Sequence, residues 1–200
     1  IERCPYFGGK IKAVDDRDAR NVNGVLDIFE IETGIAVVGL STWAALQGRK
    51  NLRITWDKGS NKYPDSGSIY KFFKNRSKKR GAKGRSDGNV KRALKNADIV
   101  VDAVYEVPFQ AHATMEPMNC TAYVQKDKCQ VWAGTQDPNG ARKIASKITG
   151  LSKKQVEVNV TFLGGGFGRR AFNDFVSEAV EISNEIKKPV KMMGSREEQR

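Results

Sequence analysis

The sequence predicts an α+β fold, in which helices and strands follow one another without an internal repeat. Two observations support this class. Several short segments bounded by glycine alternate between apolar and polar residues, which is typical of half-buried strands. Other segments begin at a capping residue and end at glycine, which is typical of helices. A length of 200 residues suffices for one large domain or two small ones.

Residues 1–57 are expected to form a compact αβ domain. Three short segments have the strand pattern, and strands are expected at 24–31, 34–40 and 52–57. A short helix is expected at 41–50, where Ser41 or Thr42 caps the start and Gly48 marks the end.

Residues 58–97 differ in composition, because they are rich in Lys, Gly, Ser and Asn. This segment is expected to connect two domains. Two short helices are predicted within it, at 66–79 and 89–96. Phe72 and Phe73 are adjacent and are expected to form the buried foot of the first helix.

Positive charge is concentrated in this connection. The net charge of the chain is +12, and +10 of it lies between Lys71 and Lys95, where eleven Lys and Arg accompany one acid, Asp87. The run is either a patch for nucleic acid or another acidic partner, or a solvated surface insertion. Aromatic residues are not interleaved through it, as a platform for stacking bases would require. The solvated insertion is therefore favoured, and no nucleic-acid partner is expected.

Residues 98–200 are expected to form a second domain. Strands are predicted at 98–109, 155–163 and 189–194, a hairpin at 119–134 with its turn near 126–128, and helices at 137–150 and 173–186. The first helix has clear end signals. Asp137 caps it, Pro138 occupies its first turn, and Gly150 closes it.

The last strand, helix and strand are predicted to form one βαβ unit. Such a crossover makes the two strands parallel and leaves a crevice at the carboxyl end of the first strand. The segment GGGFGRR, from Gly164 to Arg170, lies at that end. We refer to it as the glycine corner, and the corner is a candidate ligand site.

The glycine corner combines bare backbone with positive charge. Its four glycines can adopt positive φ and let ligand atoms approach the main chain. Consecutive amides there can bind an anion or an oxo group, and Arg169 and Arg170 can pair with phosphate. The alternative is a tight structural turn with solvent-exposed arginines.

The segment from Gly166 to Ala171 also fits the pattern G-x-G-x-x-A of Rossmann-type dinucleotide-binding domains. That pattern requires an acid about 20 residues further on, at the end of the next strand. Glu197 and Glu198 are the candidates, and they lie somewhat too far along the chain. A nicotinamide- or flavin-binding domain is therefore an alternative function.

Few residues are available to hold a metal directly. The cysteines are Cys4, Cys120 and Cys129, without C-x-x-C spacing, and His112 is the one histidine. A structural zinc or iron–sulfur site needs about four such ligands. All three cysteines are therefore expected to be ordinary small residues.

Two further expectations concern the polypeptide as a whole. The sequence has no run of about 18 apolar residues, so no membrane span is expected. It does not begin with Met, and no signal peptide is recognisable at its start. The chain is therefore expected to be a piece of a longer protein.

Three motifs together resemble a known family. HATMEPMNCTA (112–122), VWAGTQDP (131–138) and GGGFGRR (164–170) occur in the order and spacing of molybdenum hydroxylases. The chain resembles the molybdopterin-binding large chain of the xanthine dehydrogenase/aldehyde oxidase family, in particular the branch typified by the isoquinoline 1-oxidoreductase beta subunit. The resemblance covers nearly everything outside the basic connection. It implies an α/β hammerhead domain followed by part of the first molybdopterin-binding domain.

The resemblance also implies a cofactor, molybdopterin dinucleotide with molybdenum, which is usually the cytosine form in bacteria. The residues that carry over as cofactor-binding are Gln136, Gly165, Gly166, Phe167, Gly168 and Arg169. In the family, the glutamine lies beside a molybdenum oxo ligand, and the main chain of the Gly-Phe-Gly turn faces the metal end of the cofactor. The first arginine touches the pterin side or a neighbouring loop.

The implied reaction is hydroxylation of an aldehyde or N-heteroaromatic carbon with oxygen from water. The family's catalytic Glu belongs to a late segment outside this chain, so no catalytic residue is expected here. Electron transfer implies a small iron–sulfur subunit as partner. Purine-oxidising relatives carry a Glu where this chain has Ala171, so purine recognition is not expected. The isolated 200 residues are expected to be inactive and to carry little or no cofactor.

Three other residues near the motifs have expected structural roles. Glu116 is expected to hold a loop by hydrogen bonds, with lining the site as the alternative. His112 is expected to be a packing histidine rather than a base. Trp132 is expected to lie in the core of its hairpin.

Overall fold

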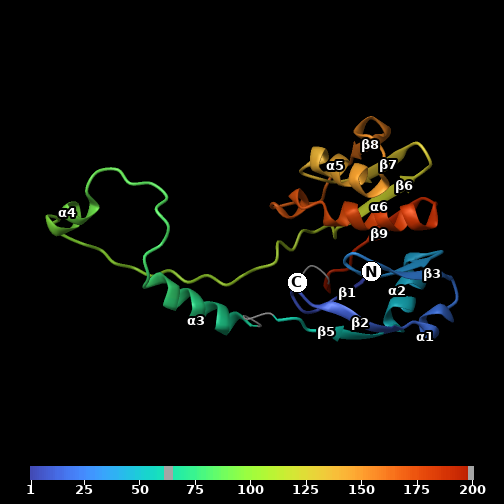
Figure 1. Cartoon of the computed structure of the whole chain (residues 1–200), viewed down its shortest axis with the longest axis horizontal. Coiled ribbons are helices and arrows are strands. Elements are labelled where there is room, and N and C mark those ends of the chain that lie inside the picture. Colours follow the sequence, from blue (N-terminus) through green and yellow to red (C-terminus); the bar gives the residue numbers. More distant parts are fainter. Residues whose placement is uncertain (61–64, 198–200) are drawn as a thin grey trace. The chain divides into compact units, whose positions relative to one another are not determined.

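The computed structural model describes residues 1–60 and 65–197 (Figure 1). The chain forms two compact units. Ile1–Gly59 and Gln110–Arg200 together form the first unit, and Ser60–Phe109 forms the second. The glycine corner belongs to the first unit. The division of the chain at residues 57 and 97 stays a prediction.

The N-terminal part of the first unit contains two small antiparallel sheets. The three-stranded sheet has the order β1 (Glu2–Arg3), β4 (Gly34–Gly39), β3 (Val25–Ile31), and the two-stranded sheet pairs β2 (Lys10–Asp15) with β5 (Arg53–Asp57). Helices α1 (Arg17–Arg20) and α2 (Thr42–Lys50) accompany them. The small core that they share consists of Ala19, Ile28, Ile35 and Val37. The three strands predicted in this part are confirmed.

Strand β2 was not predicted from the sequence. Its lysines, Lys10 and Lys12, hide the apolar alternation, and most of its residues stay exposed. The strand forms because β5 offers a complete antiparallel partner, with a register shift between Ile11 and Ala13. Pairing with a neighbour therefore decides its structure more than local pattern does.

Helix α2 occupies the predicted range and ends at Lys50, but Gly48 does not mark its end. The Ser41 hydroxyl accepts a hydrogen bond from the Ala44 N–H at 3.2 Å, which makes Ser41 the cap. The expectation that Gly48 ends the helix is wrong, since the helix continues to Lys50. A Cβ on Gly48 would lie 2.7 Å from a methyl carbon of Val25 and 2.8 Å from one of Val37. Close packing of the helix on the sheet is thus the reason for this glycine.

The C-terminal part of the first unit is a four-stranded sheet with the order β8-β7-β6-β9. Its strands are β6 (Asn119–Val124), β7 (Cys129–Ala133), β8 (Val156–Val160) and β9 (Val190–Met193). β7 and β8 are parallel, and the other two pairs are antiparallel. The predicted hairpin is confirmed as β6 and β7, whose turn is closed by a hydrogen bond from the Gln125 N–H to the Lys128 carbonyl at 2.8 Å.

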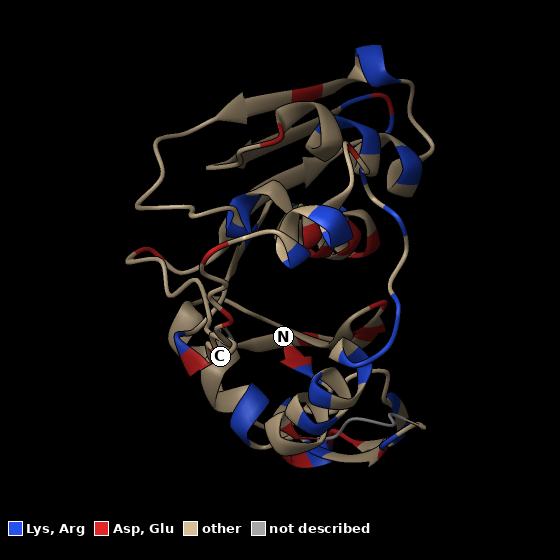
Figure 2. Ribbon diagram, turned by 90° about the vertical axis from the view of Figure 1, so that its left-hand side faces the viewer, with Lys and Arg blue, Asp and Glu red and all other residues tan. Residues whose placement is uncertain are grey.

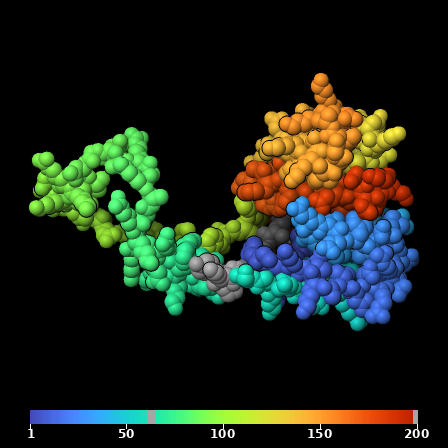
Figure 3. All heavy atoms as spheres, in the orientation of Figure 1, coloured from blue at the N-terminus to red at the C-terminus, as the bar shows by residue number. Residues whose placement is uncertain are grey.

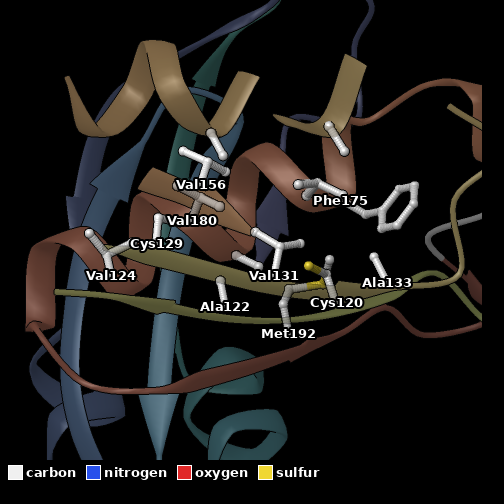
Figure 4. Close-up of a cluster of buried hydrophobic side chains, with 14 of the residues drawn as sticks. Cys120, Ala122, Val124, Cys129, Val131, Ala133, Val156, Phe175, Val180 and Met192 are labelled. Carbon is white, nitrogen blue, oxygen red and sulfur yellow. The ribbon is translucent and has the colours of Figure 1, made fainter. Parts of the chain in front are cut away.

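Two helices, α5 (Pro138–Thr149) and α6 (Asp174–Ile186), pack on one face of this sheet and bury its main core (Figure 4). The buried side chains of β6 and β7 include Cys120, Ala122, Cys129 and Val131. Both cysteines are free and fully buried, as expected for small core residues. Burial raises the pKa of Cys120 to about 12 and that of Cys129 to about 11, so both stay protonated thiols at neutral pH.

The end signals of α5 are confirmed. The Asp137 side chain accepts a hydrogen bond from the Gly140 N–H at 2.9 Å, and Pro138 is the first helical residue. Gly150 adopts the left-handed conformation at the C-terminal end, with φ of 73°. The helix therefore starts directly after Gln136 and Asp137, which places Gln136 just beyond the carboxyl end of β7.

The predicted βαβ unit is corrected in one respect. β8 and β9 run in the same direction, but they are the two edges of the sheet, with β7 and β6 between them. The adjacent parallel pair is instead β7 and β8, which α5 connects. β8 is also shorter than predicted and ends at Val160. The glycine corner nevertheless follows the carboxyl end of β8, as predicted.

An ion pair joins the two parts of the first unit. The Glu178 carboxylate on α6 accepts hydrogen bonds from Arg3 at 2.9 and 2.6 Å and from the Thr33 hydroxyl at 2.8 Å. Ile182 of α6 also packs in one apolar cluster with Ile31 and other residues of β3 and β4. Helix α6 therefore serves as a common wall for both parts.

The second unit contains α3 (Ser66–Ser77) and α4 (Val90–Lys95), close to the two predicted helices (green in Figures 1 and 3). Neither helix has a buried residue. The expectation of a buried foot is therefore wrong: Phe72 is 38% exposed and Phe73 is 50% exposed. The Phe73 ring lies 6.4 Å from that of Phe109, so the contact is between aromatic rings of this unit rather than with a core. Lys and Arg are marked in blue in Figure 2.

The strand predicted at residues 98–109 is also wrong, because this segment has no regular secondary structure. Its apolar residues are strongly exposed, among them Val101, Val104 and Tyr105. An alternating segment becomes a strand only when its backbone pairs with a neighbour, and the described residues offer it none.

Among the described residues, no helix has the length and apolar character needed to cross a membrane.

Candidate functional site

Three segments that are distant in sequence meet at the glycine corner. The corner itself follows β8, residues 134–136 follow β7, and residues 114–116 precede β6. Hydrogen bonds join the three. The Gln136 N–H donates to the Arg170 carbonyl at 3.0 Å, and the Glu116 N–H donates to the Gly164 carbonyl at 3.2 Å. The sheet thus brings all three sequence motifs to one place.

The backbone of the corner has an unusual conformation. Gly165 and Gly168 have φ of 93° and 92°, and Phe167 between them has φ of 50°. A left-handed conformation is uncommon for a residue with a side chain and costs on the order of 1 kcal/mol. The Phe167 ring is 76% exposed, so ring burial does not repay this strain. Such strain at an exposed turn is typical of sites where the backbone itself has a function.

Gln136 lies against this turn. Its side-chain Oε1 accepts a hydrogen bond from the Gly168 N–H at 3.2 Å. A Cβ on Gly166 would lie 2.5 Å from the same oxygen, so only glycine leaves room for the Gln136 amide here. The structure therefore brings Gln136 together with the three residues of the Gly-Phe-Gly turn.

Several backbone N–H groups of the corner are available to a ligand. Within residues 1–60 and 65–197, the N–H groups of Gly165, Gly166 and Phe167 have no hydrogen-bond partner. Neutral N–H donors beside a side-chain amide suit a group rich in oxygen. Together they form a group of unpaired donors at the end of the sheet.

The two arginines of the corner have different environments. Arg169 pairs with Asp174 in the first turn of α6 through two hydrogen bonds of 2.8 and 2.7 Å. Arg170 is fully buried, which contradicts the picture of a turn with two solvent-exposed arginines. Burial lowers the pKa of Arg170 and nearby Arg169 adds to this effect, whereas Glu116 opposes it.

Glu116 holds the corner from the other side. Its carboxylate accepts hydrogen bonds from the Gly164 N–H at 2.8 Å, from the Asn119 amide at 2.9 Å and from Arg170 at 2.8 Å. Burial opposes ionisation, but the hydrogen bonds from Gly164 and Asn119 and the Arg170 charge outweigh it and lower the pKa of Glu116. The architectural role expected for Glu116 thus agrees with its contacts.

Two residues near the motifs lie elsewhere than expected. His112 is exposed rather than packed, because the segment before it has no partner strand among the described residues. Trp132 is half-buried, because it alternates with Val131 and projects from the opposite face of β7. Neither contributes to the corner. Of the two acids proposed for the Rossmann pattern, Glu197 is exposed, and Glu198 is outside the described residues.

Arg170 is the residue that sequence reasoning missed. The sequence suggests either a phosphate ligand or a solvent-exposed arginine here, yet the four hydrogen-bond acceptors of Arg170 are all protein oxygens. Those oxygens belong to Gly134, Glu116 and Gly165, and the first two are distant in sequence. No local pattern connects them, so only the fold could identify the role.

Comparison with known proteins shows the family to which the chain belongs. Residues 72–200 match the family described as "Molybdopterin cofactor-binding domain". The chain belongs to this family. The match covers the hairpin, the glycine corner and the part of the basic connection from residue 72 onward, so the resemblance seen in the three motifs is confirmed.

Similar proteins include the beta subunit of isoquinoline 1-oxidoreductase from Brevundimonas diminuta, which is 29% identical over 213 residues. This match covers 99% of the chain and 27% of that protein. A subunit of nicotinate dehydrogenase from Pseudomonas putida is 23% identical over 194 residues, covering 97% of the chain and 16% of that protein. The chain thus spans about a quarter or less of the curated relatives that it matches along its whole length.

Solved structures show the same fold. Quinoline 2-oxidoreductase from Pseudomonas putida 86 superposes with a TM-score of 0.72 at 16% identity, over 99% of this chain and 31% of that one. Aldehyde oxidoreductase from Desulfovibrio gigas superposes with a TM-score of 0.73 at 14% identity, over 96% and 26%. The α+β class, with a hammerhead domain followed by part of a molybdopterin-binding domain, is therefore confirmed.

The residues of the corner fit a molybdopterin group. Gln136 and the N–H groups of Gly166 and Phe167 are neutral polar groups that can bond oxygen atoms without competing for a metal. The Glu116 carboxylate, which contacts the corner, accepts hydrogen bonds from three donors. The space beside Gln136 exists only because position 166 lacks a Cβ. These features make the corner suitable as one wall of a cofactor site.

Proposed function

We propose that this chain is part of the large subunit of a molybdenum-dependent oxidoreductase that hydroxylates an aldehyde or N-heteroaromatic carbon with oxygen from water. The observation that carries the proposal is the Gln136 amide beside N–H groups that have no hydrogen-bond partner, in a strained turn. Membership in the molybdopterin-binding family supports it, as do relatives named for isoquinoline and nicotinate oxidation. When bound, molybdopterin with molybdenum supplies the redox chemistry.

The chain's own contribution is to bind and orient the cofactor, which we propose to be the cytosine dinucleotide form. In this proposal Gln136 and the main chain of Gly166, Phe167 and Gly168 bind its metal end, and Gly165 supports the turn. Arg169 is proposed to border the cofactor while it is paired with Asp174. None of the described residues is proposed as the catalytic base.

The proposal includes a partner subunit and the inactivity of these 200 residues on their own. The described residues contain no cluster of His, Cys, Asp or Glu that could hold a metal. Electrons are proposed to leave through a small iron–sulfur subunit. Because the chain spans a minor share of its relatives, we propose that these 200 residues alone are inactive and retain little cofactor.

Two alternatives make different predictions. A Rossmann-type domain built on Gly166 to Ala171 would place its next strand beside β8, whereas β9 lies at the opposite edge of the sheet. It would bind NAD or FAD tightly. A nucleic-acid function of the run from Lys71 to Lys95 would give salt-dependent binding of random DNA. The proposed function gives neither effect.

Elemental analysis tests the proposed function. The full-length protein, purified with its partner subunit from cells that make the cofactor, is expected to hold about one molybdenum per chain, because molybdenum serves as its redox centre. Gly166→Val should lose the metal, since the larger side chain fills the space beside Gln136. Gln136→Ala should keep the metal and react slowly. Wild-type protein without molybdenum would refute the proposal.

A further inference from the structure

The most buried charge in the first unit is Arg170, and the proposed binding of the cofactor does not use its side chain. Its exposed fraction is 0%. A buried guanidinium is costly unless every donor finds an acceptor and a counter-charge lies nearby. Acceptors and a counter-charge are both present at the glycine corner, which suggests that the position of this charge has a purpose.

The guanidinium fans out to three segments. Nε donates to the Gly165 carbonyl at 2.9 Å, and Nη1 donates to the Gly134 carbonyl at 3.3 Å. Nη2 donates to the Glu116 carbonyl at 3.0 Å and to the Glu116 carboxylate at 2.8 Å. The planar group thus holds the corner, the end of β7 and the segment before β6 at fixed mutual positions.

Glu116 completes the connection. The same carboxylate oxygen that accepts from Arg170 also accepts from the Gly164 N–H at 2.8 Å. In return, the Glu116 N–H donates to the Gly164 carbonyl at 3.2 Å. The first glycine of the corner is therefore held by its N–H and its carbonyl.

We propose that Arg170 and Glu116 form an ionic latch, which holds the glycine corner in its cofactor-binding shape before the cofactor arrives. Both are positioning residues. The inference rests on the proposed function and adds the cause of the corner's shape. The donors of Gly165, Gly166 and Phe167 must remain available to a ligand, so they cannot stabilise the turn themselves.

The fork geometry explains why this position is arginine. Lysine carries the same charge, but its three N–H donors start from one nitrogen and cannot span the acceptors that Arg170 reaches from three separate nitrogens. Arg170→Lys is therefore expected to behave as a loss of the latch, although the charge is kept. Glu116→Gln keeps the size and one acceptor oxygen, and removes the counter-charge.

A matched control exists in the same unit. Glu178 is likewise a carboxylate paired with an arginine, Arg3, and one partner of each pair is buried, but Glu178 lies at the junction with the N-terminal part. Glu178→Gln removes a comparable charge without touching the corner. It separates a general loss of stability from loss of the latch.

Hydrogen exchange of cofactor-free, full-length protein tests the latch, with molybdenum content of the loaded protein as second readout. We expect the hydrogen-bonded amides of the corner, those of Gly164, Gly168 and Arg169, to exchange about 10-fold faster or more in Glu116→Gln and Arg170→Lys, because a charge-assisted hydrogen bond no longer closes the corner. Exchange within α5 should stay at the wild-type rate. Molybdenum per chain should fall in both variants. Glu178→Gln should keep wild-type exchange at the corner.

Two results would overturn the latch. One is wild-type exchange at the corner in Glu116→Gln, and the other is an equal increase in Glu178→Gln. If Arg170→Lys fails to fold, Glu116→Gln still decides, because its side chain is partly solvent-exposed and keeps its size. Failure of the proposed function looks different. It gives wild-type protein without molybdenum, while exchange of the cofactor-free protein still decides whether the latch exists.

Discussion

The substitution Gly166→Ala isolates the contact between the glycine corner and Gln136. The added Cβ would lie 2.5 Å from Oε1 and 2.8 Å from Cδ of Gln136. Ordinary contact begins at 3.4 Å, so the amide must retreat by about 0.9 Å. Its hydrogen bond to the Gly168 N–H, now 3.2 Å long, would then exceed the length at which such bonds form.

The expected effect on stability is small. Losing this one exposed hydrogen bond costs about 0.5–1.5 kcal/mol. Replacing glycine by alanine at a position without positive φ offsets about 0.4–1 kcal/mol of that, through the unfolded chain. Gln136 is a flexible, exposed side chain and can move without disturbing the core. The free energy of unfolding should therefore change by less than about 1 kcal/mol.

The expected effect on function is large. A displacement near 1 Å of a group that positions reactants can reduce the rate by about 10²-fold. The assay is turnover of an N-heteroaromatic or aldehyde substrate by the full-length protein with its partner subunit, beside urea unfolding and elemental analysis. Gly84→Ala is the matched control. A Cβ there meets no atom within 4 Å, and both stability and activity should stay at wild-type values.

A double variant can refute the reasoning. Gln136→Ala removes every atom that the new Cβ would meet within 3.4 Å. The double variant Gly166→Ala with Gln136→Ala should therefore be no worse than Gln136→Ala alone, because contacting residues are not additive. If the two losses add in full, the steric contact with Gln136 is not the cause. An activity loss accompanied by an equally large loss of stability would also contradict the argument.

Four further predictions follow from the same structure. The pKa of Glu116 is lowered by folding, so its ionised form stabilises the protein above the ordinary Glu value of about 4.3, and this contribution is lost as the pH falls below it; Glu116→Gln should flatten acid unfolding curves in that range. Glu178→Gln should cost about 2 kcal/mol in urea unfolding, since Arg3 keeps partial contact with water, and a neutral result would show that the ion pair does not join the two parts. Gly48→Ala should lower the free energy of unfolding by about 1 kcal/mol despite better helix propensity, because overpacking against β3 and β4 outweighs it; stabilisation would contradict the packing assigned here. Replacing Val101 and Val104 by lysine should reduce self-association of the 200-residue chain, measured by light scattering, because both apolar side chains are more than 80% exposed. Unchanged self-association would show that another surface mediates it.

The elements with strong local signals were predictable from sequence. Asp137, Pro138 and Gly150 mark both ends of α5, and each acts in the structure as its residue type predicts. The turn between β6 and β7 likewise follows from local composition. In these elements the decisive contacts lie within a few residues, so the sequence contains the necessary information.

The elements that were predicted wrongly depend on contacts with distant segments of the chain. Gly48 was interpreted as a helix end, but its neighbours across the interface, Val25 and Val37, explain it. Residues 98–109 have the pattern of a strand without a partner among the described residues. In both cases a distant segment, or its absence among those residues, overrides the local pattern.

The candidate site divides in the same way. Its glycines, and Gln136 through the family resemblance, were identifiable because they form short motifs. The fork of Arg170 was not, because its acceptors lie on three segments that only the sheet brings together. A motif can indicate where the backbone lacks side chains, but it does not show which contacts stabilise the conformation of that backbone.

The pairing of bare backbone with two arginines has a physical reason. A turn that offers its N–H groups to a ligand gives up the hydrogen bonds that would normally hold it. Phe167 adds strain, and its exposed ring adds no burial energy to offset it. The missing stabilisation must come from side chains outside the turn: Arg169 fastens the corner to α6, and Arg170 fastens it to Glu116 and to the end of β7. The arginines in GGGFGRR thus hold the shape that the glycines allow, and the ligand-facing donors remain neutral.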